Sequence, residues 1–469
     1  MELRPETLSA RLETWINETR EALVGDLMEL TRIPSVACAP EGPFPYGEAC
    51  GRVLEKGGEI ARRRGLVPRN HENRCVTITI PGKSERTIGI FCHLDVVPAG
   101  SNWQSAPYAP FEKDGYIFGR GVTDNKGPAA AMLSLLDFLQ QKQVALEHTL
   151  MLYLGGNEEA GMEDLDWYLA HMPPPELALT PDASFPVCRG EKGHLTAEVI
   201  LPLPAGVASF EGGSASNAVP DWASIVLRRC KPQRLQAALD RQFSIEETAE
   251  GIRISASGRS AHAASPEAGE NAIVKLCQAL LASGCLDSET ACILDAYTDL
   301  FGDCYGAGLQ AACEDEPSGR LTAVGGVLRT AGSELVQTLD IRYPVTVESD
   351  WLRERVACAV QQAGFSLCRQ RDSHPLYFPE GHPFITLLND VLSETLGQKL
   401  EPYVIGGGTY ARKLPMAAAY GHLLPGRPRP GGRGRGGGHQ ADECVSVQGL
   451  EDLMRVYLRA LIRLDHWSL

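Results

Sequence analysis

Apolar residues recur along the first part of the chain with two different spacings. From residue 8 to residue 33 they return mostly every third or fourth position, which predicts a helix, and a second helix is expected at 47–64. Short apolar or β-branched runs follow, and they predict strands at 75–80, 87–92, 149–154 and 177–180. Helices are expected between these strands at about 127–142 and 163–171. Strands that alternate with helices predict a largely parallel sheet with helices on both faces.

The pattern changes after residue 187. Strand-like runs are still separated by helices, but continuous apolar runs become fewer, which favours an α+β arrangement. Helical spacing returns at 384–396 and at about 447–462. We therefore expect an α/β domain with a mostly parallel sheet, formed by residues 1–187 and 382–469, and an α+β domain inserted as residues 188–381.

Length and composition agree with this organisation. The chain of 469 residues is too long for one ordinary core, and 43% hydrophobic with 22% charged residues is typical of a soluble globular protein. The net charge of −15 argues against a nucleic-acid partner, because phosphate binding needs a basic surface. The first residues lack the pattern of a signal peptide, and no apolar run approaches the roughly 18 residues of a membrane helix. We therefore expect a cytoplasmic protein without a membrane partner.

Fourteen cysteines are scattered singly along the chain, and none forms a Cys-x-x-Cys pair. Disulfide frameworks are typical of small secreted proteins, so we expect reduced and mostly buried thiols. A catalytic cysteine is the less favoured alternative, since none lies in an obvious thiolate-stabilising setting.

Residues 425–438 are rich in glycine, arginine and proline. One interpretation is an Arg-Gly tract that contacts RNA, and the other is a flexible surface loop. The loop is favoured, because the segment is short, lacks aromatic residues for base stacking and belongs to an acidic protein. Contact between its arginines and an anionic ligand group stays open.

A histidine and an aspartate follow the strand predicted at 87–92. His93 and Asp95 are two positions apart, so in an extended chain both side chains lie on the same side. The carboxylate of Asp95 can then fix the tautomer of His93 and strengthen it as a metal ligand. Alone, this pair is weak evidence for a metal site, and an ordinary polar pair at a strand end is the favoured interpretation.

Carboxylates occur at three further places of the same kind. Asp124 lies in a glycine-rich segment before a predicted helix, where it could also be a simple N-cap. Glu158 and Glu159 follow the next predicted strand, and two adjacent carboxylates are costly to bury without a cation. A metal ion would resolve this repulsion if one glutamate bound it and the other acted as a base. Asp182 follows the strand after that, and functional residues gather at such strand ends.

In combination these segments resemble the M20 family of metallopeptidases, and most closely its branch of PepV-like bacterial dipeptidases. The motifs occur in the family's order over nearly the whole chain. They are HLDVVPAG (93–100), GRGVTDNKGP (119–128), GGNEEAGMED (155–164), TPDASFPVCRGEKG (180–193), GRSAHAASPEAGENA (258–272), DIRYP (340–344), GGGTYARKLP (406–415) and GHQADE (438–443).

The resemblance implies a site for two zinc ions. Asp124 matches the ligand that bridges them, while His93 and Asp182 would complete one ion's shell, and Glu159 and His439 the other's. Carboxylates and imidazoles without thiolates fit zinc, although manganese or cobalt could occupy the same ligands.

The resemblance also assigns catalytic roles. Glu158 matches the general base that takes the proton of the attacking water, and Asp95 matches the acid behind the first histidine. A pair of metals would polarise the scissile carbonyl and activate that water.

His439 rests on the resemblance alone, because no strand-end argument reaches it. It directly follows the Gly-Arg-rich segment, which is more repetitive here than in relatives. His422 is therefore the competing candidate, although the GHQADE context favours His439.

The inserted domain resembles the family's lid. His262 matches the histidine that stabilises the oxyanion, and Asn217 and Arg342 match residues that hold the substrate, with Arg342 clamping its terminal carboxylate. The loop that contains Gly407, Gly408 and Thr409 matches the glycine-rich substrate loop. So long an insertion is similar to that of relatives whose histidine acts within one chain, so we expect a monomer.

The sequence thus predicts a dipeptidase that acts on short peptides with free termini. The alternative enzyme is an amidohydrolase of the same family, such as a desuccinylase or deacetylase of N-acyl amino acids. A non-catalytic peptide-binding or metal-binding relative is disfavoured, because every matched ligand and the base are present.

Overall fold

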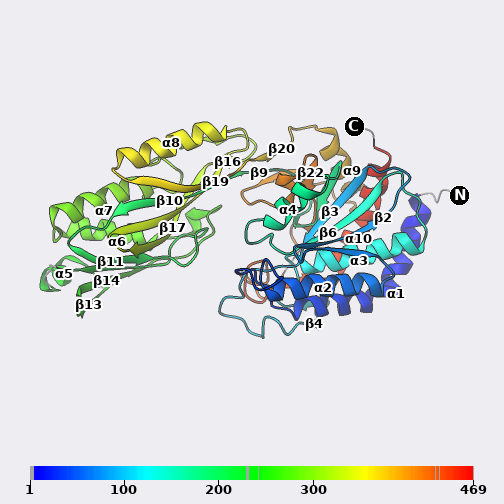
Figure 1. Cartoon of the computed structure of the whole chain (residues 1–469), viewed down its shortest axis with the longest axis horizontal. Helices are drawn as coiled ribbons and strands as arrows, with labels where there is room; N and C mark the ends of the chain where they lie inside the picture. Colours follow the sequence, from blue (N-terminus) through cyan, green and yellow to red (C-terminus); the bar gives the residue numbers. More distant parts are fainter. Residues whose placement is uncertain (1–4, 229–231, 241, 428, 433, 468–469) are drawn as a thin grey trace. The chain divides into compact units, whose positions relative to one another are not determined.

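The computed structural model describes residues 5–228, 232–240, 242–427, 429–432 and 434–467. The chain divides into two compact units, which Figure 1 colours along the sequence. The first unit comprises the chain up to Arg189, Phe378–Tyr403 and the chain from Gly408 on. The second comprises Gly190–Tyr377 and Val404–Gly407.

A six-stranded sheet lies at the centre of the first unit. In spatial order its strands are β1 (Pro68–His71), β2 (Cys75–Ile80), β6 (Thr149–Gly155), β3 (Thr87–His93), β7 (Leu177–Thr180) and β22 (Ala417–Ala419). The strands from β6 to β22 pair in parallel, whereas β1, β2 and β6 pair antiparallel. Every residue of β3 and β6 after the first is buried, so both faces of this sheet are covered.

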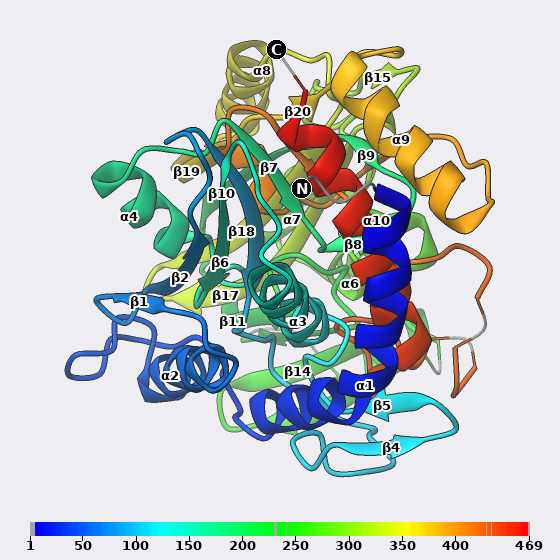
Figure 2. The same cartoon turned by 90° about the vertical axis from the view of Figure 1, so that its right-hand side faces the viewer.

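Helices provide that cover, as Figure 2 shows from the side of this unit. They are α1 (Pro5–Thr31), α2 (Glu48–Arg63), α3 (Lys126–Gln141), α4 (Glu163–His171), α9 (Pro383–Leu396) and α10 (Val447–Asp465). Helix α3 is buried on nearly all sides, because α1, α10 and β3 all pack against it. Its small side chains at 129–131 suit such close packing.

Short elements complete the first unit. β4 (Phe111–Lys113), β5 (Tyr116–Phe118) and β24 (Cys444–Ser446) form one small sheet, and β8 (Ala183–Ser184) pairs with β23 (His422–Leu423). A 3-10 helix, η2, covers Tyr410–Lys413. A further small sheet does not belong to the first unit alone, because its strands lie where the chain passes from one unit to the other: β9 (Cys188–Glu191), β20 (Leu376–Tyr377) and β21 (Tyr403–Ile405).

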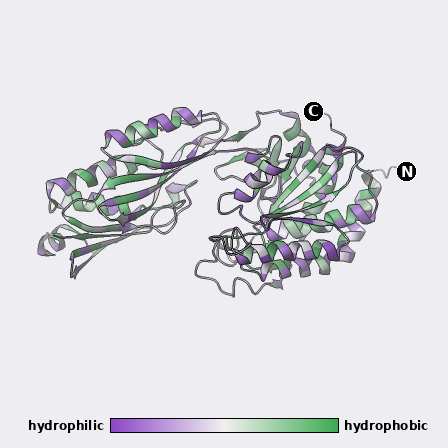
Figure 3. Cartoon of the chain, viewed as in Figure 1, coloured by the Kyte–Doolittle hydropathy of each residue, from purple (hydrophilic) through white to green (hydrophobic). Residues whose placement is uncertain are grey.

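The second unit contains an eight-stranded antiparallel sheet. Its strands, in spatial order, are β13 (Phe243–Thr248), β14 (Gly251–Ser257), β12 (Trp222–Leu227), β11 (Val207–Gly212), β17 (Thr322–Ala331), β18 (Glu334–Tyr343), β10 (Gly193–Pro202) and β19 (Ser366–Ser373). Along β10 buried and partly exposed residues alternate, which is typical of a sheet with one face on a core. Figure 3 shows the hydrophobic strands of each sheet by colour.

Helices and short strands complete this unit. The longer helices are α6 (Ala272–Ser283), α7 (Ser288–Phe301) and α8 (Ser349–Gln362), and the shorter elements are α5 (Pro232–Ala238), η1 (Pro266–Ala268), β15 (Glu314–Asp315) and β16 (Gly319–Arg320). Residues of α6, α7 and α8 share one hydrophobic core with the sheet.

The predicted fold class is confirmed: helices cover a largely parallel sheet in the first unit, and the second unit is an α+β domain. The expected helix at 8–33 begins and ends slightly earlier, at Pro5 and Thr31. Within the described ranges, no helix is both long and apolar enough to cross a membrane.

Candidate active site

The carboxyl end of β3 presents His93. The imidazole is fully buried, and its Nδ1 donates to the backbone carbonyl of Asp95 at 3.0 Å. A carbonyl oxygen can only accept, so this bond leaves the lone pair of the neutral ring on Nε2, as a metal ligand requires. The Asp95 carboxylate lies farther from Nδ1, at 3.4 Å.

That carboxylate instead organises the turn after β6. Its two oxygens accept the backbone N–H groups of Glu158 and Glu159, each at 3.0 Å. Because β3 and β6 are parallel neighbours, their ends lie side by side, with His93 opposite Gly155. Asp95 therefore fixes both the first histidine and the pair of glutamates.

The same turn is held from its other side by Asp164 of α4. Its carboxylate accepts the N–H groups of Gly156 and Asn157 at 2.8 and 3.2 Å, and it also binds the hydroxyl of Tyr410. A Cβ at Gly155 would overlap both that hydroxyl and the Asp164 carboxylate, so only glycine fits. Asp164 and Tyr410 were not among the predicted site residues, and Tyr410 reaches Asp164 from 246 positions away, which no local pattern reveals.

Asp124 lies between two histidines. Its Oδ1 is 3.0 Å from His93 Nε2, and its Oδ2 is 3.2 Å from His439 Nε2. The N-cap position of α3 belongs to Asn125, which makes no side-chain capping bond, so the capping interpretation of Asp124 is wrong. Asn125 instead donates to Asp182 Oδ1 at 3.0 Å.

The other expected ligands surround these three groups. Glu159 Oε1 lies 3.0 Å from His439 Nε2, and Asp182 Oδ2 lies 3.5 Å from His93 Nε2. Two groups of three residues could each hold a metal ion, because one ligand atom of each member lies within 4.8 Å of those of the other two. The groups are His93, Asp124 and Glu159, and His93, Glu158 and Asp182. All five proposed ligands thus converge on one place in the first unit.

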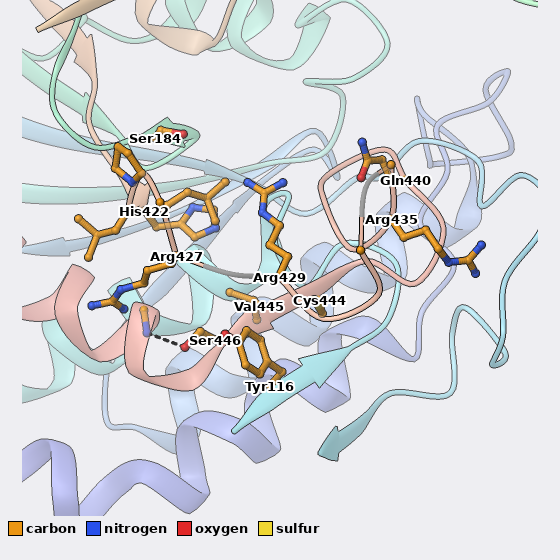
Figure 4. A pocket seen from close by; sticks show the side chains of 17 residues that line it. Tyr116, Ser184, His422, Arg427, Arg429, Arg435, Gln440, Cys444, Val445 and Ser446 are labelled. Carbon is orange, nitrogen blue, oxygen red and sulfur yellow. Dashed lines mark hydrogen bonds between the residues drawn. The ribbon is translucent and has the colours of Figure 1, made fainter. Parts of the chain in front are cut away.

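His422, the competing histidine, belongs to neither of these two groups. It is buried and its Nδ1 is 3.3 Å from the carbonyl of Pro181. It lines a cavity of about 500 Å³ beside the described part of segment 425–438, as Figure 4 shows. There Arg427 pairs with Asp452 and Arg435 with Asp442, while Pro428 and Arg433 lie outside the described residues.

The electrostatics of the cluster favour bound positive charge. Burial alone would lower the pKa of His93, but the charge of Asp182 and hydrogen bonds with Asp124 and Asp182 outweigh it and raise that pKa well above its ordinary value. Burial also opposes protonation of His439, yet its bonds to Asp124 and Glu159 raise its pKa to about 11. The carboxylates thus attract cations to nitrogen and oxygen donors, which is the donor set that Zn²⁺ binds.

The two adjacent glutamates differ in their surroundings. Burial, and then the charge of Asp124, raise the pKa of Glu159 to about 7, although His439 opposes the shift. Burial raises the pKa of Glu158 well above its ordinary range, and its Oε1 is buried without a hydrogen-bond partner. Such an orphaned carboxylate oxygen fits a group that waits for a proton, a metal or a water.

The matched residues of the second unit also form local groups. Ala263 donates its N–H to the carbonyl of Asn217 at 2.9 Å, and Nδ1 of His262 accepts the N–H of Ala264 at 3.1 Å. Arg342 of β18 forms two bonds with Asp340, at 2.8 and 3.1 Å.

The expected substrate loop is divided between the units. Arg342 Nη1 also lies 3.5 Å from the carbonyl of Gly406, which with Gly407 belongs to the second unit. Gly408 and Thr409 belong to the first unit, where Thr409 caps η2 by accepting the N–H of Ala411 at 3.2 Å.

Comparison with known proteins adds independent information. The model of "Peptidase family M20/M25/M40" matches residues 89–463. A putative dipeptidase of Bacillus subtilis, YtjP, is 32% identical over 96% of this chain and 99% of its own length. A putative dipeptidase of Staphylococcus aureus, SAB1611c, is 27% identical over 96% and 98% of the two chains.

Solved structures share the fold at low identity. The di-peptidase Dug1p of Saccharomyces cerevisiae has a TM-score of 0.60 at 14% identity, over 98% of this chain and 99% of its own. Human carnosine dipeptidase 1 has a TM-score of 0.57 at 14% identity, with the same shares covered.

Proposed function

The chain belongs to peptidase family M20/M25/M40, and from this premise we propose that it is a two-zinc dipeptidase that cleaves short peptides with free termini. Membership makes it a hydrolase that acts on peptide bonds and binds divalent metal. The dipeptidase names of relatives that match it nearly end to end support dipeptides as the substrates.

The observation that carries the proposal is the position of Asp124. Each of its two oxygens faces one imidazole, at 3.0 Å for His93 and 3.2 Å for His439. A carboxylate shared in this way suits a bridging ligand. In the proposal Asp182 completes the shell on the His93 side and Glu159 the shell on the His439 side.

Within the proposal, Glu158 is the general base. Its buried carboxylate has an unpartnered oxygen, and burial raises its pKa, so it can hold a proton between water and the leaving amine. Asp95 keeps Glu158 in place through the backbone bond at 3.0 Å. When bound, the metal pair supplies Lewis-acid polarisation of the carbonyl and a lowered pKa of the attacking water.

The second unit is proposed to bind the substrate. Arg342 would pair with the terminal carboxylate, assisted by Asn217 and by the loop at Gly407, Gly408 and Thr409. Asp340 holds two nitrogens of the Arg342 guanidinium, which fixes its plane. His262 would donate to the oxyanion, because Nδ1 accepts a backbone N–H and the proton of a neutral ring therefore lies on Nε2.

A substrate panel tests the proposal. The zinc-loaded protein, and parallel samples with manganese or cobalt, would be assayed on dipeptides, on the same dipeptides with a blocked N-terminus, and on N-acetyl and N-succinyl amino acids. We expect hydrolysis of the free dipeptides and little of the blocked ones. Turnover of N-acyl amino acids alone would overturn the dipeptidase in favour of the amidohydrolase.

A further inference from the structure

A buried ion pair joins two motifs that are far apart in the sequence. Arg120 Nη1 donates to Glu443 Oε2 at 2.6 Å, and the two residues are 1% and 0% exposed. Arg120 belongs to the GRGVTDNKGP segment and Glu443 ends the GHQADE segment. Neither side chain is among the proposed ligands, and Arg120 and Glu443 have no part in the proposed chemistry.

The Glu443 carboxylate also accepts three backbone N–H groups from one turn. Gly121 donates to Oε2 at 3.0 Å, while Thr123 and Asp124 donate to Oε1 at 2.9 and 3.1 Å. Gly121 has a φ of +88°, which favours glycine and lets the turn wrap around the carboxylate. The backbone of Asp124 is thereby fixed by a side chain that lies 319 positions later.

Arg120 extends the same network to a third segment. Its Nη2 donates to the carbonyl of Ala99 at 3.1 Å, at the end of the loop that begins with His93. Its Nη1 also donates to the carbonyl of Gln440 at 3.3 Å, directly after His439. One ion pair therefore contacts the three segments that carry His93, Asp124 and His439.

We propose that Glu443, together with Arg120, is a positioning residue that sets the spacing of His93, Asp124 and His439 before metal binds. The inference rests on the proposed function, because the ligand roles are those assigned there. Loss of the carboxylate would leave the Arg120 charge buried without the opposite charge of Glu443 and would weaken the bonds to the three N–H groups. The ligand segments would then have to be ordered by the metal itself, at the expense of affinity.

The test is a zinc titration of metal-free protein against a chelating competitor. We expect Glu443→Gln to bind zinc about 10- to 100-fold more weakly, as loss of groups that orient metal ligands does. At saturating zinc its KM for a dipeptide should equal that of the wild type, because Glu443 does not belong to the proposed substrate site.

A matched control removes a different buried pair in the same unit. Asp26 accepts from Arg64 Nε at 2.8 Å, with side chains 5% and 7% exposed. Asp26→Asn should lower stability and leave zinc affinity unchanged. Equal affinity in Glu443→Gln and wild type would overturn this inference alone, whereas a wild type that binds no zinc would overturn the proposed function and this inference with it.

A second measurement needs no variant. In metal-free wild type, the amide hydrogens of Gly121, Thr123 and Asp124 should exchange slowly, because the carboxylate already holds them. Exchange at the rate of unstructured amides, with protection only after zinc is added, would show that the metal orders the turn and would overturn the proposal.

Discussion

Glu158 and Glu159 show how neighbouring residues of one type acquire different chemistry. Both are held by backbone bonds to Asp95, yet Glu159 faces His439 at 3.0 Å while Glu158 keeps one oxygen without a partner. This difference supports the assignment of Glu159 as a ligand and Glu158 as the base. It depends on the direction of each side chain, which two identical letters in a sequence do not reveal.

Replacement of the proposed base should separate binding from chemistry. Glu158→Gln keeps the size of the side chain but cannot take a proton, so kcat should fall by roughly 10²- to 10⁴-fold. Zinc content, measured by atomic absorption, should stay at two ions per chain. Near-normal turnover would remove Glu158 from the role of base.

A second prediction concerns His262, the proposed oxyanion donor. His262→Ala should lower kcat by roughly 10²- to 10³-fold, as removal of an oxyanion donor does. Steady-state kinetics on a dipeptide would show the change in kcat, and His374→Ala, at an exposed histidine of the same unit, serves as the control. A change confined to KM would make His262 a binding residue instead.

In the second unit, the buried carboxylate of Asp340 links strand β18 to strand β10. His194 of β10 donates to Asp340 of β18 at 2.9 Å, and Asp340 also binds Arg342. Burial alone would raise the pKa of Asp340, but the bonds to His194 and Arg342 lower it to about 2. This carboxylate is only 2% exposed, so solvent screens the interaction little.

The lowered pKa of Asp340 makes the stability of the second unit depend on pH. The stabilisation that Asp340 gives to the folded state is fully present above its unfolded pKa of about 4 and is lost as the pH falls towards 2. A pKa shift of this size corresponds to about 2 kcal/mol of unfolding free energy. Asp340→Asn should therefore destabilise the second unit at pH 7 by about that amount, with a smaller difference near pH 3. Urea unfolding at both pH values would measure it.

The control for this prediction lies on the same strand. Glu334 at the start of β18 is exposed, so Glu334→Gln should change the unfolding free energy little at either pH. An Asp340→Asn penalty that is equal at pH 7 and pH 3 would contradict the assigned cause.

The division of the chain into two units affects how metal stabilises the whole molecule. All five proposed ligands lie in the first unit, and the second unit has its own hydrophobic core. Zinc should therefore stabilise the first unit alone, by about 4 kcal/mol for each site at a free zinc concentration 1,000 times Kd.

Calorimetry can resolve this prediction. When the metal-free protein is compared with the zinc-loaded protein, the transition of the first unit should move to higher temperature by several degrees, at roughly 2–4 °C per kcal/mol. The transition of the second unit should stay in place. Asp124→Asn should abolish the shift, whereas an equal movement of both transitions would contradict a site confined to the first unit.

Much of the fold follows from local pattern. The strands at 87–92, 149–154 and 177–180 were predicted from continuous apolar runs, and in the structure they are β3, β6 and β7 of one parallel sheet. Such runs reflect burial on both faces, which is visible in a single strand. The antiparallel pairing and the order of the eight strands in the second unit depend on contacts between segments far apart, which periodicity does not contain.

The residues of the candidate site divide in the same way. The sequence by itself determined which polar residues lie at the ends of the predicted elements, so it identified His93, Asp124, Glu158, Glu159 and Asp182 as candidates for one site, and family resemblance added His439. That assignment of ligands stays a prediction. Only the tertiary structure decided that Asp124 faces two histidines, that Asp95 binds the backbone of the glutamates, and that Glu443 binds a turn more than 300 positions away. The physical reason is that periodicity records the burial of each segment, whereas the direction of a hydrogen bond depends on which segments the fold brings together.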